Sequence, residues 1–222
     1  MISVQSFPLP PVNRREIQRY AGIQEELPAL TALLEETLDE VTSLLTGKVC
    51  WSEFPVFGTG SGLDLGFTES DSEALKRNLA GCERVVVFAA TLGLGLDRLI
   101  ARYGYLSPAK MLMLQAIGAE RIEALCDVFC EKIRQDAAQN GLYPVPRFSP
   151  GYGDLPLQIQ NDIFRVLDCP RKIGLTLNES LLMSPSKSVT AIVGLSPCAG
   201  PNPNNSCSRC SKTDCMYRRT TE

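Results

Sequence analysis

The strongest constraint on the fold is a continuous apolar run, ERVVVFAATL, at residues 83–92. The run is rich in β-branched and aromatic residues and lacks the alternating polar positions of a half-buried strand. Such a pattern is typical of a strand that is buried on both faces. We therefore expect residues 83–92 to form a central strand of a sheet.

A long helix is expected after this strand. Ser107 can cap its first turn, and Pro108 suits the first helical position. The helical pattern continues to Asn140-Gly141, and its apolar faces come from Leu114, Ile117, Leu125, Phe129 and Ile133. Shorter helices are expected at residues 13–20, 25–45, 70–80 and 157–167.

Two further segments have the pattern of paired strands. Residues 49–67 contain two short apolar runs separated by a glycine-rich turn, and residues 175–183 and 188–195 are expected to form a hairpin. Together with the helices, these segments predict an α+β fold: a mixed or antiparallel twisted sheet with flanking helices, one of them long and central. Residues 1–196 are expected to form a single globular unit.

The composition excludes several classes of function. The chain contains no histidine, which rules out Ser/His and Cys/His catalysis and histidine zinc ligands. A net charge of −3 provides no broad positive field, so nucleic acid is not an expected partner. No apolar run approaches the roughly 18 residues needed to span a bilayer, and the N-terminal segment lacks the pattern of a secretion signal. We therefore expect no membrane partner and a cytoplasmic location.

The nine cysteines fall into two groups. Five lie in segments with regular patterns and are expected to be reduced core thiols, namely Cys50, Cys82, Cys126, Cys130 and Cys169. The other four lie in an irregular tail, residues 197–222, which is too polar to build a core unaided: Cys198, Cys207, Cys210 and Cys215.

The clustering of the tail cysteines is compatible with ligation of zinc or an iron–sulfur cluster. Their spacing is not the paired C-x2-C of a zinc ribbon, so redox-active or simply reduced thiols remain an alternative. Arg218 and Arg219 would favour thiolate over thiol. A metal- or cluster-carrying redox protein, with the globular part as a docking scaffold, is therefore one hypothesis for the function.

Four carboxylates lie along one face of the predicted long helix. They are Glu120, Glu123, Asp127 and Glu131, at spacings of three, four and four residues. Such a stripe either faces water or forms a docking surface for a basic or imidazole-bearing partner. The pattern alone leaves both interpretations open.

The loop PVPRFSPGYGDLP, residues 144–156, has the composition of a ligand-binding segment. It holds Arg147 close to Phe148 and Tyr152 on a backbone stiffened by prolines. Arginine can hold a carboxylate through two hydrogen bonds, and an aromatic ring can stack on a purine or face a sulfonium cation. S-adenosylmethionine carries all three groups, although loops rich in proline and glycine are also ordinary structural turns.

Taken in order, four segments resemble the activation domain of cobalamin-dependent methionine synthase. The segments are ERVVVFAATLG, ERIEALCDVFCEKIR, RFSPGYGDLP and IGLTLNESLLMSPSKSVTAIVG, within residues 83–195. The most specific elements are R-x-x-x-G-Y, at Arg147, Gly151 and Tyr152, and E-S-x-x-M-x-P, at Glu179, Ser180, Met183 and Pro185. The first 80 residues do not follow the family pattern, so its N-terminal acidic ligand has no assigned position here.

This resemblance implies a set of site residues. S-adenosylmethionine would be held by Arg147, Phe148, Ser149, Gly151 and Tyr152. Glu123, with Glu120 on the same helix, would face the corrinoid partner near the histidine displaced from cobalt. No side chain is required as a nucleophile or general base, because the two cofactors supply the chemistry.

The resemblance also implies a function in the reactivation of another protein. The chain would act as an accessory protein for the reductive methylation of cob(II)alamin on a separate cobalamin-dependent methionine synthase, with flavodoxin or a similar electron donor. The sequence has no D-x-H-x-x-G segment, so the cobalamin would be carried by the partner protein. A corrinoid methyltransferase other than methionine synthase is an alternative client.

Overall fold

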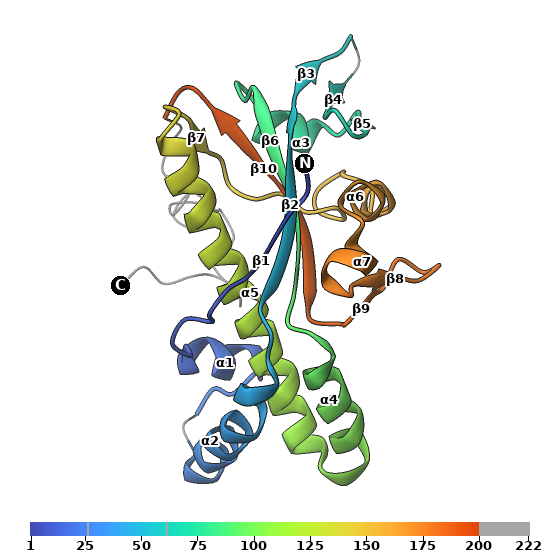
Figure 1. Ribbon diagram of the computed structural model, residues 1–222. Coiled ribbons are helices and arrows are strands. Elements are labelled where there is room, and N and C mark those ends of the chain that lie inside the picture. The colour runs from blue at the N-terminus through green and yellow to red at the C-terminus, as the bar shows by residue number, and fades with distance from the viewer. Residues whose placement is uncertain (26, 61, 200–222) are drawn as a thin grey trace.

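The computed structural model describes residues 1–25, 27–60 and 62–199. Its centre is a five-stranded sheet in which every pair of neighbours is antiparallel (Figure 1). In spatial order the strands are β1 (Ser3–Ser6), β2 (Lys48–Pro55), β6 (Arg84–Thr91), β10 (Ser188–Ser196) and β7 (Tyr143–Pro144). This arrangement confirms the α+β class predicted from the sequence.

Strand β6 occupies the middle of the sheet, as its apolar run predicted. All of its residues after Arg84 are buried. Because successive side chains of a strand point to opposite faces, they divide between two hydrophobic cores. Val86, Phe88 and Ala90 belong to one core, and Val85, Val87 and Ala89 belong to the other.

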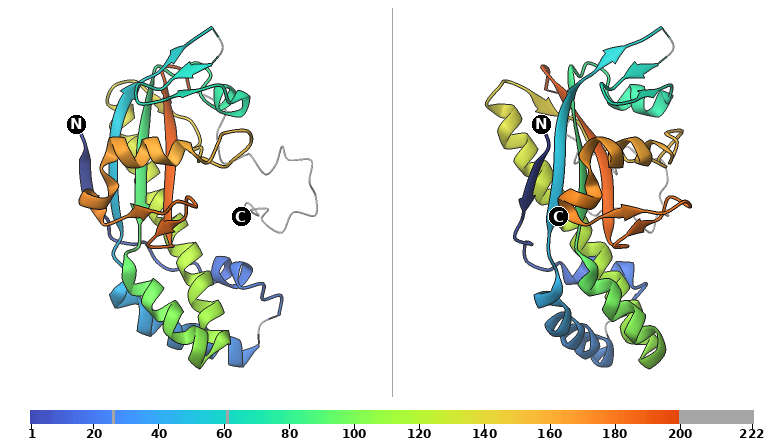
Figure 2. Two further views of the ribbon diagram at one scale, coloured as in Figure 1. Left: turned by 90° about the vertical axis from the view of Figure 1, so that its right-hand side faces the viewer. Right: turned by 45° about the vertical axis from the view of Figure 1, so that its right-hand side comes forward.

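Helices cover both faces of this sheet. The long helix α5 (Pro108–Ala138) lies on one face, while α6 (Ile159–Leu167) and α7 (Cys169–Ile173) lie on the other (Figures 1 and 2). Three helices pack on the first half of α5 beyond the end of the sheet: α1 (Arg14–Tyr20), α2 (Pro28–Val41) and α4 (Leu94–Leu106). A short 3-10 helix (Thr42–Leu44) follows α2, and α3 (Glu73–Asn78) lies near the opposite end of the sheet.

Local signals set the start and the packing of α5. The Ser107 side chain accepts a hydrogen bond from the Lys110 amide at 3.4 Å, and Pro108 occupies the first turn, as predicted. On the buried side of the helix, the Phe129 ring lies 4.9 Å from that of Phe88 and 5.0 Å from that of Trp51, centroid to centroid. Phe129 therefore joins α5 to the central and neighbouring strands.

The glycine-rich turn of residues 58–62 joins two short strands, β3 (Phe57–Gly58) and β4 (Leu63–Asp64). These strands form a small sheet with β5 (Glu69–Ser70). The first apolar run of residues 49–67 belongs mostly to β2. This strand pairs with β1 and β6, and not with the second run across the turn.

The predicted hairpin between residues 175–183 and 188–195 is wrong. The first segment folds back on itself, because β8 (Thr176–Leu177) pairs with β9 (Met183–Ser184). Strand β10 pairs instead with β6 on one side and β7 on the other. The physical reason is that β10 is buried along nearly its whole length, and an interior position in the sheet buries it better than an exposed hairpin would.

The five cysteines predicted as core thiols are free. Cys50, Cys126 and Cys169 are buried, and Cys82 and Cys130 are partly buried. No helix within the described ranges is long and apolar enough to cross a bilayer. Beyond residue 199, the predicted cysteine-rich tail lies outside the described residues.

We predict that Phe129→Ala lowers the free energy of unfolding by about 3–5 kcal/mol, because it removes a fully buried ring from the contact between helix and sheet. Urea denaturation followed by circular dichroism measures this loss. Leu182→Ala is the control: that side chain is 65% exposed, so we expect a change within about 0.5 kcal/mol. Equal effects of the two substitutions would contradict the assigned core.

Candidate functional site

The segment that contains the predicted ligand residues follows β7 and pairs with β10 on the side that faces away from β6. The Val145 amide donates to the Gly194 carbonyl at 2.9 Å, and Phe148 and Ile192 exchange two backbone hydrogen bonds of 2.8 Å each. Neighbouring side chains in such an extended segment point to opposite sides. Phe148 packs with the core beneath α6 and α7, whereas Arg147 reaches α5 on the other side.

Arg147 forms two ion pairs with carboxylates of α5. Its Nη2 lies 2.6 Å from Glu123 Oε2, and its Nη1 lies 2.6 Å from Asp127 Oδ1. The arginine side chain is only 21% exposed. Burial opposes its charge, but the hydrogen bond to Asp127 and the surrounding negative charges outweigh burial and raise the pKa of Arg147. The predicted ligand arginine and the predicted acidic stripe thus meet at one point.

A thiol lies beneath this arginine. Cys130, one helical turn after Cys126 on α5, has its Sγ 3.9 Å from Arg147 Nη1. Burial raises the pKa of both thiols, and the Arg147 charge offsets this only in part. Both cysteines are therefore neutral near pH 7, in agreement with their predicted role as core residues.

After Arg147 the chain makes a compact turn. The Tyr152 amide donates to the Ser149 carbonyl at 3.1 Å, and the Gly151 amide donates to the Leu155 carbonyl at 2.9 Å. The Tyr152 side chain is 68% exposed, so its ring is available for a contact outside the protein. The predicted residues Arg147, Ser149, Gly151 and Tyr152 therefore belong to one ordered loop.

This loop is attached to the start of α3, a contact that the sequence did not reveal. Asp154 accepts hydrogen bonds from the Ser72 hydroxyl and from the amides of Glu73 and Ala74, the latter two at 2.8 and 3.1 Å. Gly153 has φ +56°, and a Cβ there would lie 2.8 Å from the Ala74 Cβ. No local pattern connects Asp154 with a helix 80 residues earlier, which is why sequence analysis missed it.

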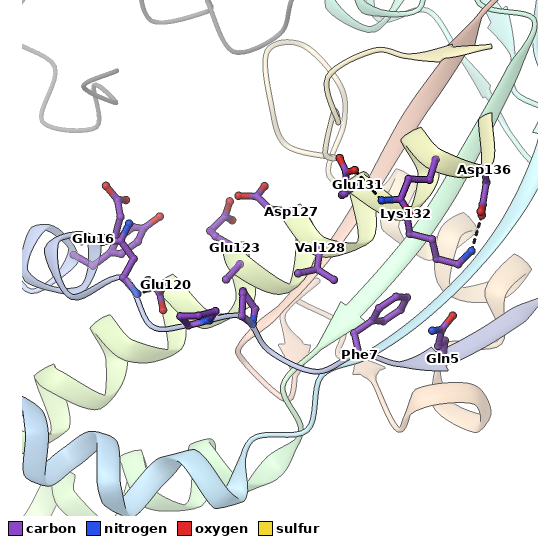
Figure 3. A pocket seen from close by; sticks show the side chains of 16 residues that line it. Gln5, Phe7, Glu16, Glu120, Glu123, Asp127, Val128, Glu131, Lys132 and Asp136 are labelled. Atoms are coloured by element: carbon purple, nitrogen blue, oxygen red, sulfur yellow. Dashed lines mark hydrogen bonds and ion pairs between the residues drawn. The ribbon is translucent and has the colours of Figure 1, made fainter. Parts of the chain in front are cut away.

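The acidic stripe of α5 lines a groove of about 1010 Å³ (Figure 3). Its other wall is the N-terminal segment, including Phe7 and Tyr20. Six carboxylates line this acidic groove: Glu16, Glu120, Glu123, Asp127, Glu131 and Asp136. Lys132 is the single basic side chain among the described lining residues, so carboxylates outnumber basic groups along the lining.

The two residues predicted to face the partner, Glu120 and Glu123, differ in their surroundings. Glu120 is 5% exposed, pairs with Arg121 and accepts a hydrogen bond from the Asn13 amide at 3.1 Å. Arg121 in turn donates to the Pro10 carbonyl at 2.6 Å, so this pair ties the N-terminal segment to α5. Glu123 is 37% exposed and is the more accessible of the two.

The segment E-S-x-x-M-x-P, residues 179–185, spans the turn after β8 and strand β9, and the residue that follows it contacts α4. Asp97 of α4 accepts hydrogen bonds from the Ser186 amide at 2.7 Å and from its hydroxyl at 2.5 Å. These contacts place the connection between β9 and β10 beside α4, at the end of the sheet that faces this helix. The segment therefore positions the strand along which the Arg147 loop runs.

The predicted metal ligands lie mostly beyond the described residues. Cys198 is exposed, and its amide donates to the Ser196 hydroxyl at 3.2 Å. Cys207, Cys210 and Cys215 lie outside the described residues. Within the described ranges, no group of three or more His, Cys, Asp or Glu side chains is arranged to hold a metal ion. Ligation by the tail cysteines stays a prediction.

The fold is similar to that of a solved structure described as "Crystal Structure of the MetH Reactivation Domain bound to AdoHcy". The TM-score is 0.63 at 16% sequence identity, over 91% of this chain and 80% of that chain. At this level of identity the likeness shows the fold alone. A search of curated proteins finds no match.

A family model described as "Vitamin B12 dependent methionine synthase, activation domain" matches residues 75–202. The match covers more than half of the chain and includes β6, α5, the Arg147 loop and β10. It confirms the resemblance predicted from the sequence over residues 83–195. The chain therefore belongs to the family of vitamin B12-dependent methionine synthase activation domains.

Proposed function

We propose that this protein binds S-adenosylmethionine at the Arg147 loop and presents it to a corrinoid carried by a partner, in support of reductive methylation of cob(II)alamin on a cobalamin-dependent methionine synthase. The observation that carries this proposal is the position of Arg147. Its guanidinium pairs with two carboxylates of α5, and the loop that carries it also carries an exposed aromatic residue, Tyr152.

Two side chains of this loop, Arg147 and Tyr152, match groups of S-adenosylmethionine. A guanidinium can hold the ligand carboxylate through two parallel hydrogen bonds. Tyr152 offers a ring face for the adenine. The backbone of Phe148, Ser149 and Gly151 connects these groups, and the packed Phe148 side chain holds the loop in place.

Family membership supports this choice of ligand. The solved structure of similar fold is described as a reactivation domain bound to AdoHcy. S-adenosylhomocysteine has the same carboxylate, ammonium and adenine groups as S-adenosylmethionine and lacks the methyl group. A site that recognises one of them through these groups also fits the other.

The protein's contribution to the reaction would be orientation. S-adenosylmethionine supplies an activated methyl group, and the cobalamin of the partner supplies the metal that accepts it. Arg147 and Tyr152 would fix the ligand at the edge of the sheet, which raises the effective concentration of the methyl group at the partner. No histidine or other general base is needed in this chain.

We propose the acidic groove as the surface that faces the partner. Glu123 and Asp127 point into it and reach solvent, so they can receive a basic or imidazole group. Glu120 would act indirectly: its contacts with Asn13 and Arg121 hold the N-terminal segment that forms the other wall of the groove. The corrinoid would be carried by a polypeptide segment other than these 222 residues, and flavodoxin or a similar protein would supply the electron.

We expect Arg147→Ala to abolish S-adenosylmethionine binding without unfolding the protein, because the variant loses the partner of the ligand carboxylate. Isothermal titration calorimetry measures the binding, and circular dichroism checks the fold. The matched control is Arg165→Ala, since Arg165 is 74% exposed on α6 and pairs with Asp162. Unchanged affinity in Arg147→Ala, or equal loss in both variants, would sink the assignment of the site.

The accessory role predicts a reaction that needs all components together. A methionine synthase corrinoid module in the cob(II)alamin state should regain the absorption spectrum of methylcobalamin when this protein, S-adenosylmethionine and reduced flavodoxin are added. Arg147→Ala should leave the spectrum unchanged. If the wild-type protein binds S-adenosylmethionine but does not restore this module, the client is a different corrinoid protein.

Asp154 links the ligand loop to stability at low pH. Hydrogen bonds from the Ser72 hydroxyl and the Ala74 amide lower the pKa of Asp154 from 3.8 to about 2. A carboxyl whose pKa is lower in the folded state stabilises the fold above its unfolded pKa and loses this effect as the pH falls through the folded value. The window therefore runs from about pH 4 down to about pH 2.

We expect Asp154→Asn to have a lower Tm than the wild type at about pH 6, and the difference to shrink as the pH falls from about 4 to about 2. Thermal unfolding followed by circular dichroism at a series of pH values measures both quantities. A Tm difference that stays constant over this range would show that the Asp154 charge is not responsible.

A further inference from the structure

The six carboxylates of the acidic groove are neutralised in two different ways. Four of them pair with a cation of their own helix: Glu16 with Arg19, Glu120 with Arg121, Glu131 with Arg134 and Asp136 with Lys132. Glu123 and Asp127 instead pair with Arg147, which belongs to the ligand loop. The charge of this part of the groove therefore depends on the position of one loop residue.

The two nitrogens that hold these carboxylates, Nη1 and Nη2, form one of the guanidinium edges through which arginine can grip a ligand carboxylate. Nη1 of Arg147 donates to Asp127 and Nη2 donates to Glu123, each at 2.6 Å. A bidentate grip on a ligand carboxylate uses two donors of the fork, and the fork is rigid and planar. A ligand carboxylate that takes the Nη1 and Nη2 donors therefore competes with the α5 carboxylates for Arg147.

We propose that Arg147 exchanges partners when the ligand binds: the carboxylate of S-adenosylmethionine displaces Glu123 and Asp127 from the guanidinium, and the two released carboxylates then face the groove as a binding site for a cationic group of the partner. This inference rests on the proposed function and adds a coupling between its two surfaces. The small molecule and the partner would each favour the binding of the other.

The exposure of the three side chains supports this exchange. Arg147 is 21% exposed, whereas Glu123 and Asp127 are 37% and 53% exposed. Both carboxylates line the groove already, so their release requires no movement of α5. An arginine that moves from two carboxylates to a third keeps its own charge compensated, and the unpaired charge appears only in the groove.

Linkage makes this coupling reciprocal. If releasing Glu123 and Asp127 favours a cation in the groove by some factor, that cation tightens the ligand by the same factor. A substitution that removes one competing carboxylate should mimic the bound cation. We therefore expect neutral variants of Glu123 and Asp127 to bind S-adenosylmethionine more tightly than the wild type does.

The experiment compares dissociation constants from isothermal titration calorimetry for the wild type, Glu123→Gln and Asp127→Asn. We expect the Kd of S-adenosylmethionine to fall roughly two- to fivefold in each variant, the range typical of partly exposed ion pairs. Glu131→Gln is the matched control, because Glu131 lies on the same helix and in the same groove but pairs with Arg134. Its Kd should equal that of the wild type.

A second ligand separates competition from a general change in the site. 5′-Methylthioadenosine lacks the carboxylate, the ammonium group and the sulfonium charge of S-adenosylmethionine, so its Kd should be the same in all of these proteins. Unchanged or weaker binding of S-adenosylmethionine in both Glu123→Gln and Asp127→Asn would overturn the exchange, as would equal tightening of 5′-methylthioadenosine. Failure of the wild type to bind S-adenosylmethionine at all would instead contradict the proposed function.

Discussion

The architecture depends on the burial of β6 on both of its faces. Val85, Val87 and Ala89 require cover on one side, and Val86, Phe88 and Ala90 require it on the other. Each large apolar side chain contributes about 1.5–3 kcal/mol when it is fully buried, so neither face can be left open. Helix α5 covers one face, while α6 and α7 cover the second. The strands beside β6 each have one side that faces away from β6, and the candidate site is built along such an edge of β10.

The site follows from the alternation of side chains along one of those edges. Phe148 and Ile192 are directly paired, which sets the register of the loop on β10. In this register Phe148 packs against the core, and Arg147 reaches the carboxylates of α5. A shift of one residue would place the guanidinium in the apolar layer and the phenyl ring beside Glu123. The backbone hydrogen bonds between Phe148 and Ile192 therefore determine whether Arg147 can neutralise the carboxylates of the groove along α5.

Sequence reasoning succeeded where the signal is local. The apolar run of β6 and the Ser107-Pro108 start of α5 predicted the right elements, because periodicity and capping depend on neighbouring residues. The composition of the Arg147 loop and its resemblance to a family also led to a proposed ligand and to the residues that would hold it, and these residues stay predictions.

It failed where contacts join distant segments. The pairing of β10 with β6 connects residues about 100 positions apart, and no local pattern distinguishes it from the hairpin that we predicted. The same holds for Arg147 with Glu123 and for Asp154 with Ser72, which are 24 and 82 residues apart. Such contacts are decided by tertiary packing, so residue spacing alone could list candidate residues for the site but not their partners.

The prolines of the Arg147 loop also affect how other polypeptide chains can associate with the edge of the sheet. Strand β7 is an outer strand of the sheet, and an outer strand with free amides can recruit a foreign strand and start aggregation. Pro144, Pro146 and Pro150 have no amide hydrogen, so this border offers few donors to an incoming strand. The prolines that stiffen the ligand loop therefore also disfavour the addition of further strands to the sheet. This border thus stays available for a specific protein partner.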